Sequence, residues 1–178
     1  LADGKTVKAG DLTLERPRLT RVLQTLRAKS NWGKKLGSGR GQGVACNIYD
    51  GDTHLGYAVE VTADEKRWRV DRVVCAVDCG VAVNPTGVEQ QIESGVIWAL
   101  GQLMSQITIR SGRVEQSSYS DYNVPHIADA PRIEVHILSS DKEQAFGMGE
   151  PPVPPLVPAV LNAIFDATGK RIRRLPVA

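Results

Sequence analysis

Five prolines crowd into residues 151–158, and they limit what the end of this chain can fold into. A proline fixes its φ angle at about −65° and carries no backbone N–H, so the pairs at 151–152 and 154–155 cannot lie in a central strand. We therefore predict a rigid proline-rich arm at 151–155 and a helix over 155–168 that ends at Gly169. The apolar face of this helix is predicted from the helical spacing of Val157, Leu161, Ile164, Phe165 and Thr168.

One carboxylate, Glu150, stands directly before the proline-rich arm. It follows Gly147-Met148-Gly149, whose glycines lack a Cβ and let backbone come close to a ligand. We expect the arm and its helix to hold this carboxylate in a fixed position. The local pattern leaves two interpretations open: a site residue, or a solvated glutamate near a helix N-terminus that the helix dipole stabilises.

Three strands are predicted in the first half of the chain. Residues typical of strands are divided by two polar turns, Asp50-Gly51-Asp52 and residues 63–66, which gives antiparallel strands over roughly 43–49, 54–62 and 67–78. The stretch GSGRGQG before them is interpreted as a flexible connector. A phosphate-binding loop is the less favoured alternative, because the Gly-Lys-Ser/Thr ending of such a loop is missing.

Two further helices are predicted. The first covers residues 16–32, and its apolar face is formed by Leu19, Val22, Leu23 and Leu26. The second begins at Pro85 with Asn84 as its N-cap and is apolar enough to be largely buried. Its glycines, Gly95 and Gly101, each cost about 1 kcal/mol relative to alanine, so we expect a close approach of another backbone to offset them.

Short strands complete the expected fold. They are a hairpin around Ser111-Gly112, a strand at 131–138 with His136 facing solvent, and a closing strand at 170–177. This order predicts an α+β fold, a mainly antiparallel sheet with packed helices. We divide the chain into an N-terminal helical segment with its linker, residues 1–36, and a main body, residues 37–178.

Composition excludes some partners. Lys and Arg total 22 against 20 for Asp and Glu, and a formal net charge of +2 gives no argument for nucleic acid. No apolar run reaches the roughly 18 to 20 residues of a membrane span, so none is expected in this chain. The chain begins LADGKTVKAG, without an initiator Met, which we interpret as a cut from a longer polypeptide. The compartment, bacterial cytoplasm or periplasm, therefore stays open.

Other candidate site residues have structural interpretations. The three cysteines, Cys46, Cys75 and Cys79, lack zinc spacing and are expected to be buried thiols, so no metal ligand is predicted. Asp78 ends a predicted strand, where a carboxylate can accept backbone N–H groups and brace the turn, with a site role as the alternative. The arginines of the closing strand are expected on its solvent face, with anion binding as the alternative.

Three stretches together resemble a known family. They are VVCAVDCGVAVNPTGVEQQIESG, GRVEQSSYSDYNVPHIADAPRIEVHIL and GMGEPPVPPLVPAVLNAIFDATGKRIRRLPV, in family order and spacing. Over about residues 37–178 the sequence resembles the C-terminal part of the molybdopterin-binding large subunits of the xanthine dehydrogenase and aldehyde oxidase family, in particular the isoquinoline 1-oxidoreductase beta-subunit type and related bacterial aldehyde dehydrogenases. The departures are Met148, where Val is commoner, and Ser94, where the family helix usually reads Glu-Gly-Gly.

The resemblance implies roles for the turn before the prolines. In the family, the Glu of the Gly-x-Gly-Glu turn lies beside the molybdenum and acts as the base on a molybdenum-bound hydroxyl, and it matches Glu150. The residues just before it lie against the molybdenum–pterin site and are Phe146, Gly147, Met148 and Gly149 here. Such enzymes hydroxylate an aldehyde, or a carbon beside nitrogen in an aromatic heterocycle, with oxygen from water.

The resemblance also implies cofactors and partners. The cofactor would be molybdenum–molybdopterin in a dinucleotide form, and iron–sulfur clusters would lie on a small 2Fe–2S subunit. Family subunits are several times longer, so this chain alone is expected to be inactive and to need the remainder of the large subunit. The alternative is a non-catalytic interaction module whose proline-rich arm docks a partner.

Overall fold

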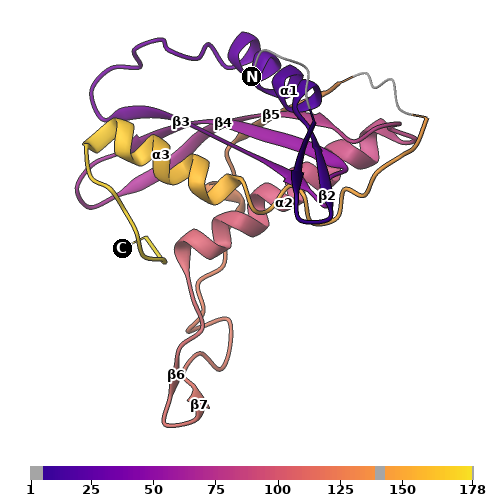
Figure 1. The fold of residues 1–178 in the computed structure, drawn as a ribbon. Helices are drawn as coiled ribbons and strands as arrows, with labels where there is room; N and C mark the ends of the chain where they lie inside the picture. The colour runs from indigo at the N-terminus through magenta and orange to yellow at the C-terminus, as the bar shows by residue number, and fades with distance from the viewer. Residues whose placement is uncertain (1–5, 139–142, 178) are drawn as a thin grey trace.

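The computed structural model describes residues 6–138 and 143–177. Its centre is a four-stranded sheet in the order β3-β4-β5-β8 (Figure 1), and β1–β2 and β6–β7 form two separate two-stranded hairpins. The strands are β1 (Thr6–Ala9), β2 (Leu12–Glu15), β3 (Arg40–Tyr49), β4 (Thr53–Ala63), β5 (Trp68–Asp78), β6 (Ile109–Arg110), β7 (Arg113–Val114) and β8 (Arg132–Ile137). The helices are α1 (Arg16–Lys29), α2 (Pro85–Met104), α3 (Leu156–Thr168) and the short 3-10 helix η1 (Ile127–Asp129).

The three predicted antiparallel strands are confirmed as β3, β4 and β5. Asp50 and Gly51 both have positive φ angles, 51° and 81°, as a tight hairpin turn between β3 and β4 requires. In the turn between β4 and β5, Asp64 Oδ1 accepts the N–H groups of Lys66 (2.7 Å) and Arg67 (2.8 Å). The polar turns that divide the sequence therefore set the register of the sheet.

The fourth strand, β8, pairs with β5 in parallel, Arg72 opposite Arg132. The chain between them forms α2 and a long excursion, because parallel neighbours need a crossover connection. The α+β class is confirmed, with one parallel pair in a mainly antiparallel sheet.

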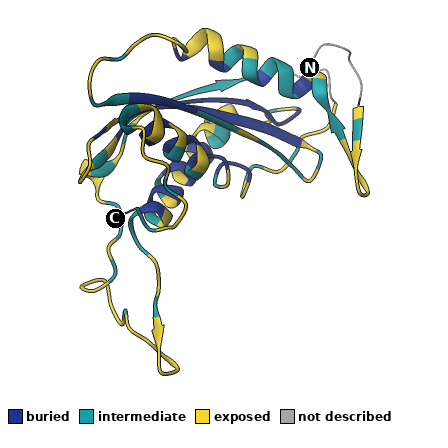
Figure 2. Ribbon diagram, turned by 60° about the vertical axis from the view of Figure 1, so that its left-hand side comes forward, coloured by how far each residue is buried: buried dark blue, intermediate teal, exposed yellow. Residues whose placement is uncertain are grey.

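The sheet separates two cores (Figures 1 and 2). On one face α1 packs Val22 and Leu26 against Ala58, Val74 and Ala76. The other face is covered by α2 and α3 and holds the larger core, which includes Tyr57, Val59, Val73, Cys75, Ile92, Val96, Leu103, Leu156, Ala159 and Ala163. Only one side of α2 is buried, so the prediction of a largely buried helix is wrong for its outer side, where Trp98 is 71% exposed.

Helix α3 buries a face shifted from the one predicted: Ile164 is buried as expected, whereas Val157 and Leu161 are only half-buried. Its buried residues are Leu156, Ala159, Val160, Ala163 and Ile164, whereas Phe165 is exposed. The reason lies in the glycine-rich stretch, part of which belongs to β3 and is not a connector. A Cβ on Gly41 would overlap the backbone of Ala163, and one on Gly43 would overlap the backbone of Ala159. Small residues on both sides therefore let helix and strand come unusually close.

The predicted closing strand at 170–177 does not form. The segment runs back past α2, and the Val177 N–H donates to Leu103 O (2.8 Å). Arg171 lies over the ring of Phe165, 3.7 Å from its centroid, and donates to Asn162 Oδ1 (3.2 Å). Contacts with the side chains of α3 thus replace the predicted strand.

Three smaller expectations also need correction. The N-terminal segment contains the β1–β2 hairpin, which was not predicted, and α1 ends at residue 29. Cys75 and Cys79 are buried as predicted, but Cys46 is exposed, because it lies on the edge strand β3. His136 does not face open solvent as predicted but is half-buried, because it lies on the side of the sheet that α1 covers. Its Nε2 is buried without a hydrogen-bond partner among the described residues.

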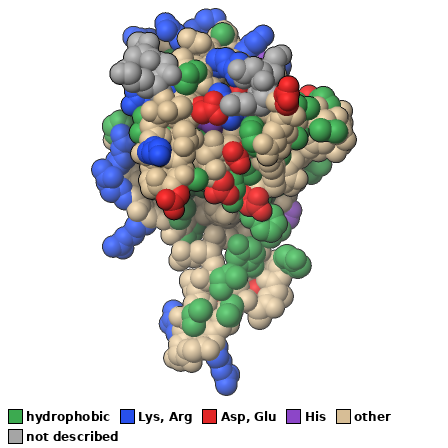
Figure 3. Space-filling view, turned by 45° about the vertical axis from the view of Figure 1, so that its right-hand side comes forward, with side chains coloured by type: hydrophobic (Ala, Val, Ile, Leu, Met, Phe, Trp, Pro, Cys, Tyr) green, Lys and Arg blue, Asp and Glu red, His purple; other side chains and the backbone are tan. Residues whose placement is uncertain are grey.

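Residues 105–131, which include η1, connect α2 to β8, and the part of this connection around β6–β7 projects from the body below α2 (Figures 1 and 2). The predicted hairpin around Ser111-Gly112 is confirmed at its tip as β6–β7. Apolar side chains are exposed along this connection (Figure 3): Ile107 61%, Ile109 71%, Val114 52%, Tyr119 85% and Ile127 96%. Across the described residues, none of the helices combines the length and the hydropathy of a membrane span.

Candidate functional site

The Gly-x-Gly-Glu turn lies at the surface, at one end of the sheet. Gly147, Gly149 and Glu150 are exposed, whereas Phe146 and Met148 are half-buried. Met148 packs against the large core, so its side chain is turned inward. Glu150 is thus the only acid of residues 146–150, and it stands free at the end of a turn whose other side chains face the protein.

Hydrogen bonds from separate elements hold this turn. Thr53 Oγ1, at the start of β4, donates to Gly147 O (2.9 Å), and Gln91 Nε2, on α2, donates to Gly149 O (3.0 Å). On the near side, the Phe146 N–H donates to Cys79 O (2.9 Å). The turn uses its carbonyl groups for anchoring, whereas the N–H groups of residues 147–150 donate to no acceptor in the described part of the chain.

The proline-rich arm is packed into the body. Pro151, Pro152 and Pro155 are buried, and the hydroxyl of the buried Tyr57 donates to Pro152 O (2.9 Å). The ring of Pro152 lies against Gly95 of α2, where an added Cβ would come within 2.5 Å of Pro152 Cβ. The expected close approach is therefore found at Gly95 but not at Gly101, where an added Cβ would come no closer than 3.5 Å to Pro125 Cδ. A partner that binds the proline-rich arm would have to displace these contacts, which disfavours the alternative of a docking module.

An open pocket of about 440 Å³ lies beside Glu150. Gln91, Ser94 and Trp98 of α2 form one side of it, and Tyr49 closes the end of β3. The remaining lining residues are Gly95, Gly149, Glu150, Val153 and Pro154. The carboxylate therefore faces a partly apolar hollow that includes an exposed indole.

Behind the turn, Asp78 and Arg18 form a buried ion pair. Arg18 Nε donates to Asp78 Oδ2 (3.0 Å), Arg18 Nη2 donates to Oδ1 (2.8 Å), and the two side chains are 3% and 0% exposed. Asp78 also accepts from Arg21 Nη2 (2.9 Å) and from the Gly80 N–H (3.2 Å), so the predicted brace at the strand end is confirmed. Burial raises the pKa of Asp78, but these hydrogen bonds and charges outweigh it and leave the pKa below its ordinary value.

A buried histidine lies next to this pair. His54 is 0% exposed, faces Asp78 across β4 and β5, and contacts Asp52 O through Nδ1 (3.1 Å). Its Nε2 is buried without a hydrogen-bond partner among the described residues. Burial, and then the charge of Arg18, lower the pKa of His54, so the imidazole is neutral near pH 7.

Four of these residues escaped the sequence analysis: Arg18, Thr53, Tyr57 and Gln91. Arg18 gave a signal, because it lies four residues before Val22 and eight before Leu26 and so shares the apolar stripe of α1. A cation in that position predicts a buried partner. Thr53, Tyr57 and Gln91 gave no signal, since their partners are backbone carbonyls distant in sequence.

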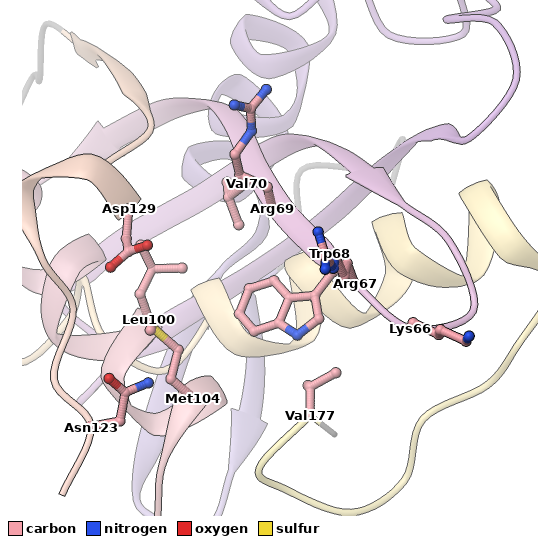
Figure 4. A pocket seen from close by; sticks show the side chains of 10 residues that line it. All are labelled: Lys66, Arg67, Trp68, Arg69, Val70, Leu100, Met104, Asn123, Asp129 and Val177. Atoms are coloured by element: carbon pink, nitrogen blue, oxygen red, sulfur yellow. The ribbon is translucent and has the colours of Figure 1, made fainter.

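A second pocket, of about 360 Å³, lies elsewhere on the molecule (Figure 4). It is bordered by Trp68 of β5, Leu100 and Met104 of α2, and Val177. None of residues 145–150 lines it. We therefore assign the candidate site to the pocket that contains Glu150.

Comparisons with known proteins identify the family of the chain. Residues 7–131 match the model of the molybdopterin cofactor-binding domain. The chain is 31% identical over 167 residues to the beta chain of isoquinoline 1-oxidoreductase from Brevundimonas diminuta, a match that covers 90% of this chain and 21% of the relative. It is 37% identical over 105 residues to the large subunit of nicotine 6-hydroxylase from Paenarthrobacter nicotinovorans, a match that covers 56% of this chain and 13% of the relative.

A solved structure has the same fold. The aldehyde oxidoreductase of Desulfovibrio desulfuricans superimposes with a TM-score of 0.63 at 26% identity, over 70% of this chain and 14% of that one. The chain thus spans about a fifth or less of the length of these relatives. The match to the family model ends at residue 131, before the Gly-x-Gly-Glu turn. The match over residues 7–131 and the shared fold show that this chain belongs to the molybdopterin cofactor-binding domain family of the molybdenum hydroxylases.

Proposed function

We propose that this chain forms one wall of the active site in the large subunit of a molybdenum hydroxylase, with Glu150 as the catalytic base. One observation carries the proposal: an exposed carboxylate stands at the end of a turn whose carbonyl groups are anchored by Thr53 and Gln91. A base must be held within hydrogen-bond reach of the proton that it removes, and fixed placement supplies this condition.

The turn also fits the proposed cofactor. The N–H groups of residues 147–150 have no acceptor within the described residues, and the glycines leave their surroundings open, with no atom within 4 Å of an added Cβ at Gly147 or Gly149. Free N–H groups in an open turn suit the oxygen-rich, anionic groups of a pterin cofactor. We therefore propose that Phe146, Gly147, Met148 and Gly149 form the part of the wall that lies against molybdenum–molybdopterin.

In this proposal the bound cofactor supplies the oxygen transfer and accepts the two electrons that leave the substrate. The carboxylate of Glu150 accepts the proton of the water-derived hydroxyl that becomes the new oxygen of the product. The hydrogen bonds from Thr53 and Gln91 hold the backbone of the turn in place when the carboxylate of Glu150 gains or loses its charge. The buried prolines 151 and 152 fix the chain on the other side.

The partners follow from the same proposal. The substrate would be an aldehyde or an N-heterocyclic aromatic compound, and the hollow with the exposed Trp98 suits a flat, apolar molecule. The cofactor would carry a dinucleotide, iron–sulfur clusters on a small 2Fe–2S subunit would take up the electrons, and the remainder of the large subunit would supply the other walls. The chain alone would be inactive.

A substitution in the complete enzyme tests the proposal. Glu150→Gln keeps the shape of the side chain but removes the base, so we expect kcat to fall by about 100-fold or more, with molybdenum and pterin contents unchanged. Glu65→Gln is the matched control, because Glu65 is also an exposed turn residue but does not line the pocket. Near-normal turnover of the Glu150→Gln enzyme would overturn the assignment of the base.

A further inference from the structure

We infer that Arg18, on the first helix, is a positioning residue for the Glu150 turn and acts through the ring of Phe146. The inference deepens the proposed function and rests on it. Arg18 does not line the pocket beside Glu150. Its influence would pass through buried contacts that join α1, the end of β5 and the segment that leads into the turn.

The first link is the position of the guanidinium itself. Arg18 forms two parallel hydrogen bonds to the Asp78 carboxylate, and its Nη2 also donates to the backbone Asp78 O (3.1 Å). With both side chains almost completely buried, neither group can exchange its partner for water. The plane of the guanidinium is therefore fixed relative to the end of β5.

The second link joins the end of β5 to the segment before the turn. Asp78 Oδ1 accepts the Gly80 N–H, and Gly80 pairs with Ala145 in an antiparallel bridge. The Phe146 N–H donates to Cys79 O (2.9 Å), and the Val81 N–H donates to Gln144 O (3.0 Å). The backbone of residues 144–146 is thus paired with residues 79–81, and the carboxylate that binds Arg18 also accepts the N–H of Gly80 in that segment.

The third link is the Phe146 ring. Arg18 Cζ lies 5.1 Å from its centroid, within the range of a cation–π contact. On another side, a Cβ on Gly80 would come within 2.9 Å of Phe146 Cδ2, so only a glycine leaves room for the ring. Gly80 has a φ of 70°, which glycine adopts without strain. Together, Arg18 and Gly80 confine the ring.

Confinement of the ring matters because glycines follow it. Gly147 and Gly149 place little restriction on the direction of the chain, so the path toward Glu150 must be set by the anchors on each side. Gln91 and the prolines supply the far anchor. Phe146, held by Arg18, is the near anchor, assisted by Thr53 at Gly147 O.

Arginine suits this position better than lysine. A planar guanidinium can bind a carboxylate through two N–H groups while its face lies over a ring, whereas an ammonium group is a point charge and cannot do both. Lysine at position 18 would keep the positive charge next to Asp78 but loosen the orientation of the ring. Arg18→Lys is therefore a selective test of positioning.

The experiment compares three single variants in the complete enzyme: Arg18→Lys, Phe146→Leu and the matched control Arg72→Lys. Arg72, on β5 like Asp78, forms a similar two-bond pair with Glu134 of β8 (both 2.9 Å), and its other hydrogen-bond partners, Glu60 and Lys29 O, lie outside residues 143–150. Hydrogen–deuterium exchange of the 143–150 peptide, kcat, KM, and molybdenum and pterin contents are measured for each, and the double variant Arg18→Lys/Phe146→Leu is added.

We expect Arg18→Lys and Phe146→Leu each to speed exchange of the 143–150 peptide several-fold and to lower kcat by about 10- to 100-fold, because displacements of about 1 Å can cost about 100-fold in rate. KM should change by less than about 3-fold, and the cofactor content should stay unchanged. In the double variant, Arg18→Lys should lower kcat by no more than about 3-fold beyond Phe146→Leu, since both changes remove one contact. Arg72→Lys should leave exchange and kcat near wild type.

Two results would overturn the inference: an Arg18→Lys enzyme with the exchange and kcat of Arg72→Lys, or losses that multiply in the double variant. If Arg18→Lys does not fold, Phe146→Leu alone decides, and normal exchange with normal kcat in that variant refutes the inference. The exchange measurement separates this inference from the proposed function. A Glu150→Gln enzyme with normal turnover would refute the base, whatever the exchange of the turn shows.

Discussion

Alanine at Gly95 and alanine at Gly101 should differ in their effect on stability, although both residues lie inside α2. In a helix interior, alanine is favoured over glycine by about 1 kcal/mol, and this gain is common to both variants. Their surroundings differ. A Cβ at position 95 would lie 2.5 Å from Pro152 Cβ and 3.4 Å from Pro152 Cγ, whereas a Cβ at position 101 would lie 3.5 Å from Pro125 Cδ.

The contact at position 95 cannot be relieved by a side-chain rotation, because the ring of Pro152 is closed onto its own backbone. Either α2 or the proline-rich arm must move, and overpacking of this kind costs about 1 to 3 kcal/mol. Against the gain of about 1 kcal/mol, Gly95→Ala should lose between about 0 and 2 kcal/mol. At Gly101 the new contacts are ordinary, so Gly101→Ala should gain about 1 kcal/mol.

Urea unfolding of the 178-residue chain, followed by tryptophan fluorescence, measures this difference. The two variants should be separated by about 1 to 3 kcal/mol in unfolding free energy, with unchanged m-values, which corresponds to midpoints about 0.5 to 1.5 M apart for an m-value of about 2 kcal/mol/M. Because both variants replace glycine by alanine inside α2, the gain in helix propensity is the same in both and cancels in the difference between their unfolding free energies. Equal stability of the two variants, or a more stable Gly95→Ala, would refute the packing argument at Pro152.

Two further predictions concern buried polar groups of the same region. Tyr57→Phe leaves Pro152 O buried without its donor and should lower the unfolding free energy, measured in urea, by about 1 to 3 kcal/mol. The control Tyr119→Phe, at a residue that is 85% exposed, should change it by less than about 0.5 kcal/mol. Similar losses in the two variants would contradict the role of the Tyr57 hydroxyl. The pKa of His54 is lowered in the folded chain, so its contribution to stability is complete above the unfolded value of about 6.5 and is lost as the pH falls toward the folded value. The urea concentration at the unfolding midpoint should therefore decrease as the pH is lowered below about 6.5. His54→Gln should make this decrease smaller. An unchanged pH dependence in that variant would show that His54 is not its source.

Much of the sheet could be predicted from local sequence, since Asp50-Gly51 and Asp64 specify tight turns by their own chemistry. The buried face of α3 could not. Periodicity favours the larger apolar residues, but the glycines of β3 select the face with Ala159 and Ala163, and that pairing joins segments more than a hundred residues apart.

The same distinction holds at the candidate site. Glycines and prolines around Glu150 indicated a rigid turn from sequence alone, because their backbone restrictions are local. Its anchors, Thr53 and Gln91, donate to main-chain carbonyls, which every residue has, so no pattern in the sequence marks them. Arg18 is the exception, because a cation on an apolar stripe signals a buried partner.

The parallel pairing of β8 with β5 has a consequence for the order of folding. Paired residues in the β3–β4 hairpin are as little as four positions apart, Tyr49 with Thr53, whereas Arg72 and its partner Arg132 are sixty positions apart. Contacts between residues distant in sequence cost more chain entropy to form. We therefore expect the β3–β5 meander to form early in folding and β8 to pair with β5 late. Since the Glu150 turn follows β8 in sequence, it would be among the last parts of the domain to reach its place, after the strand that precedes it has docked.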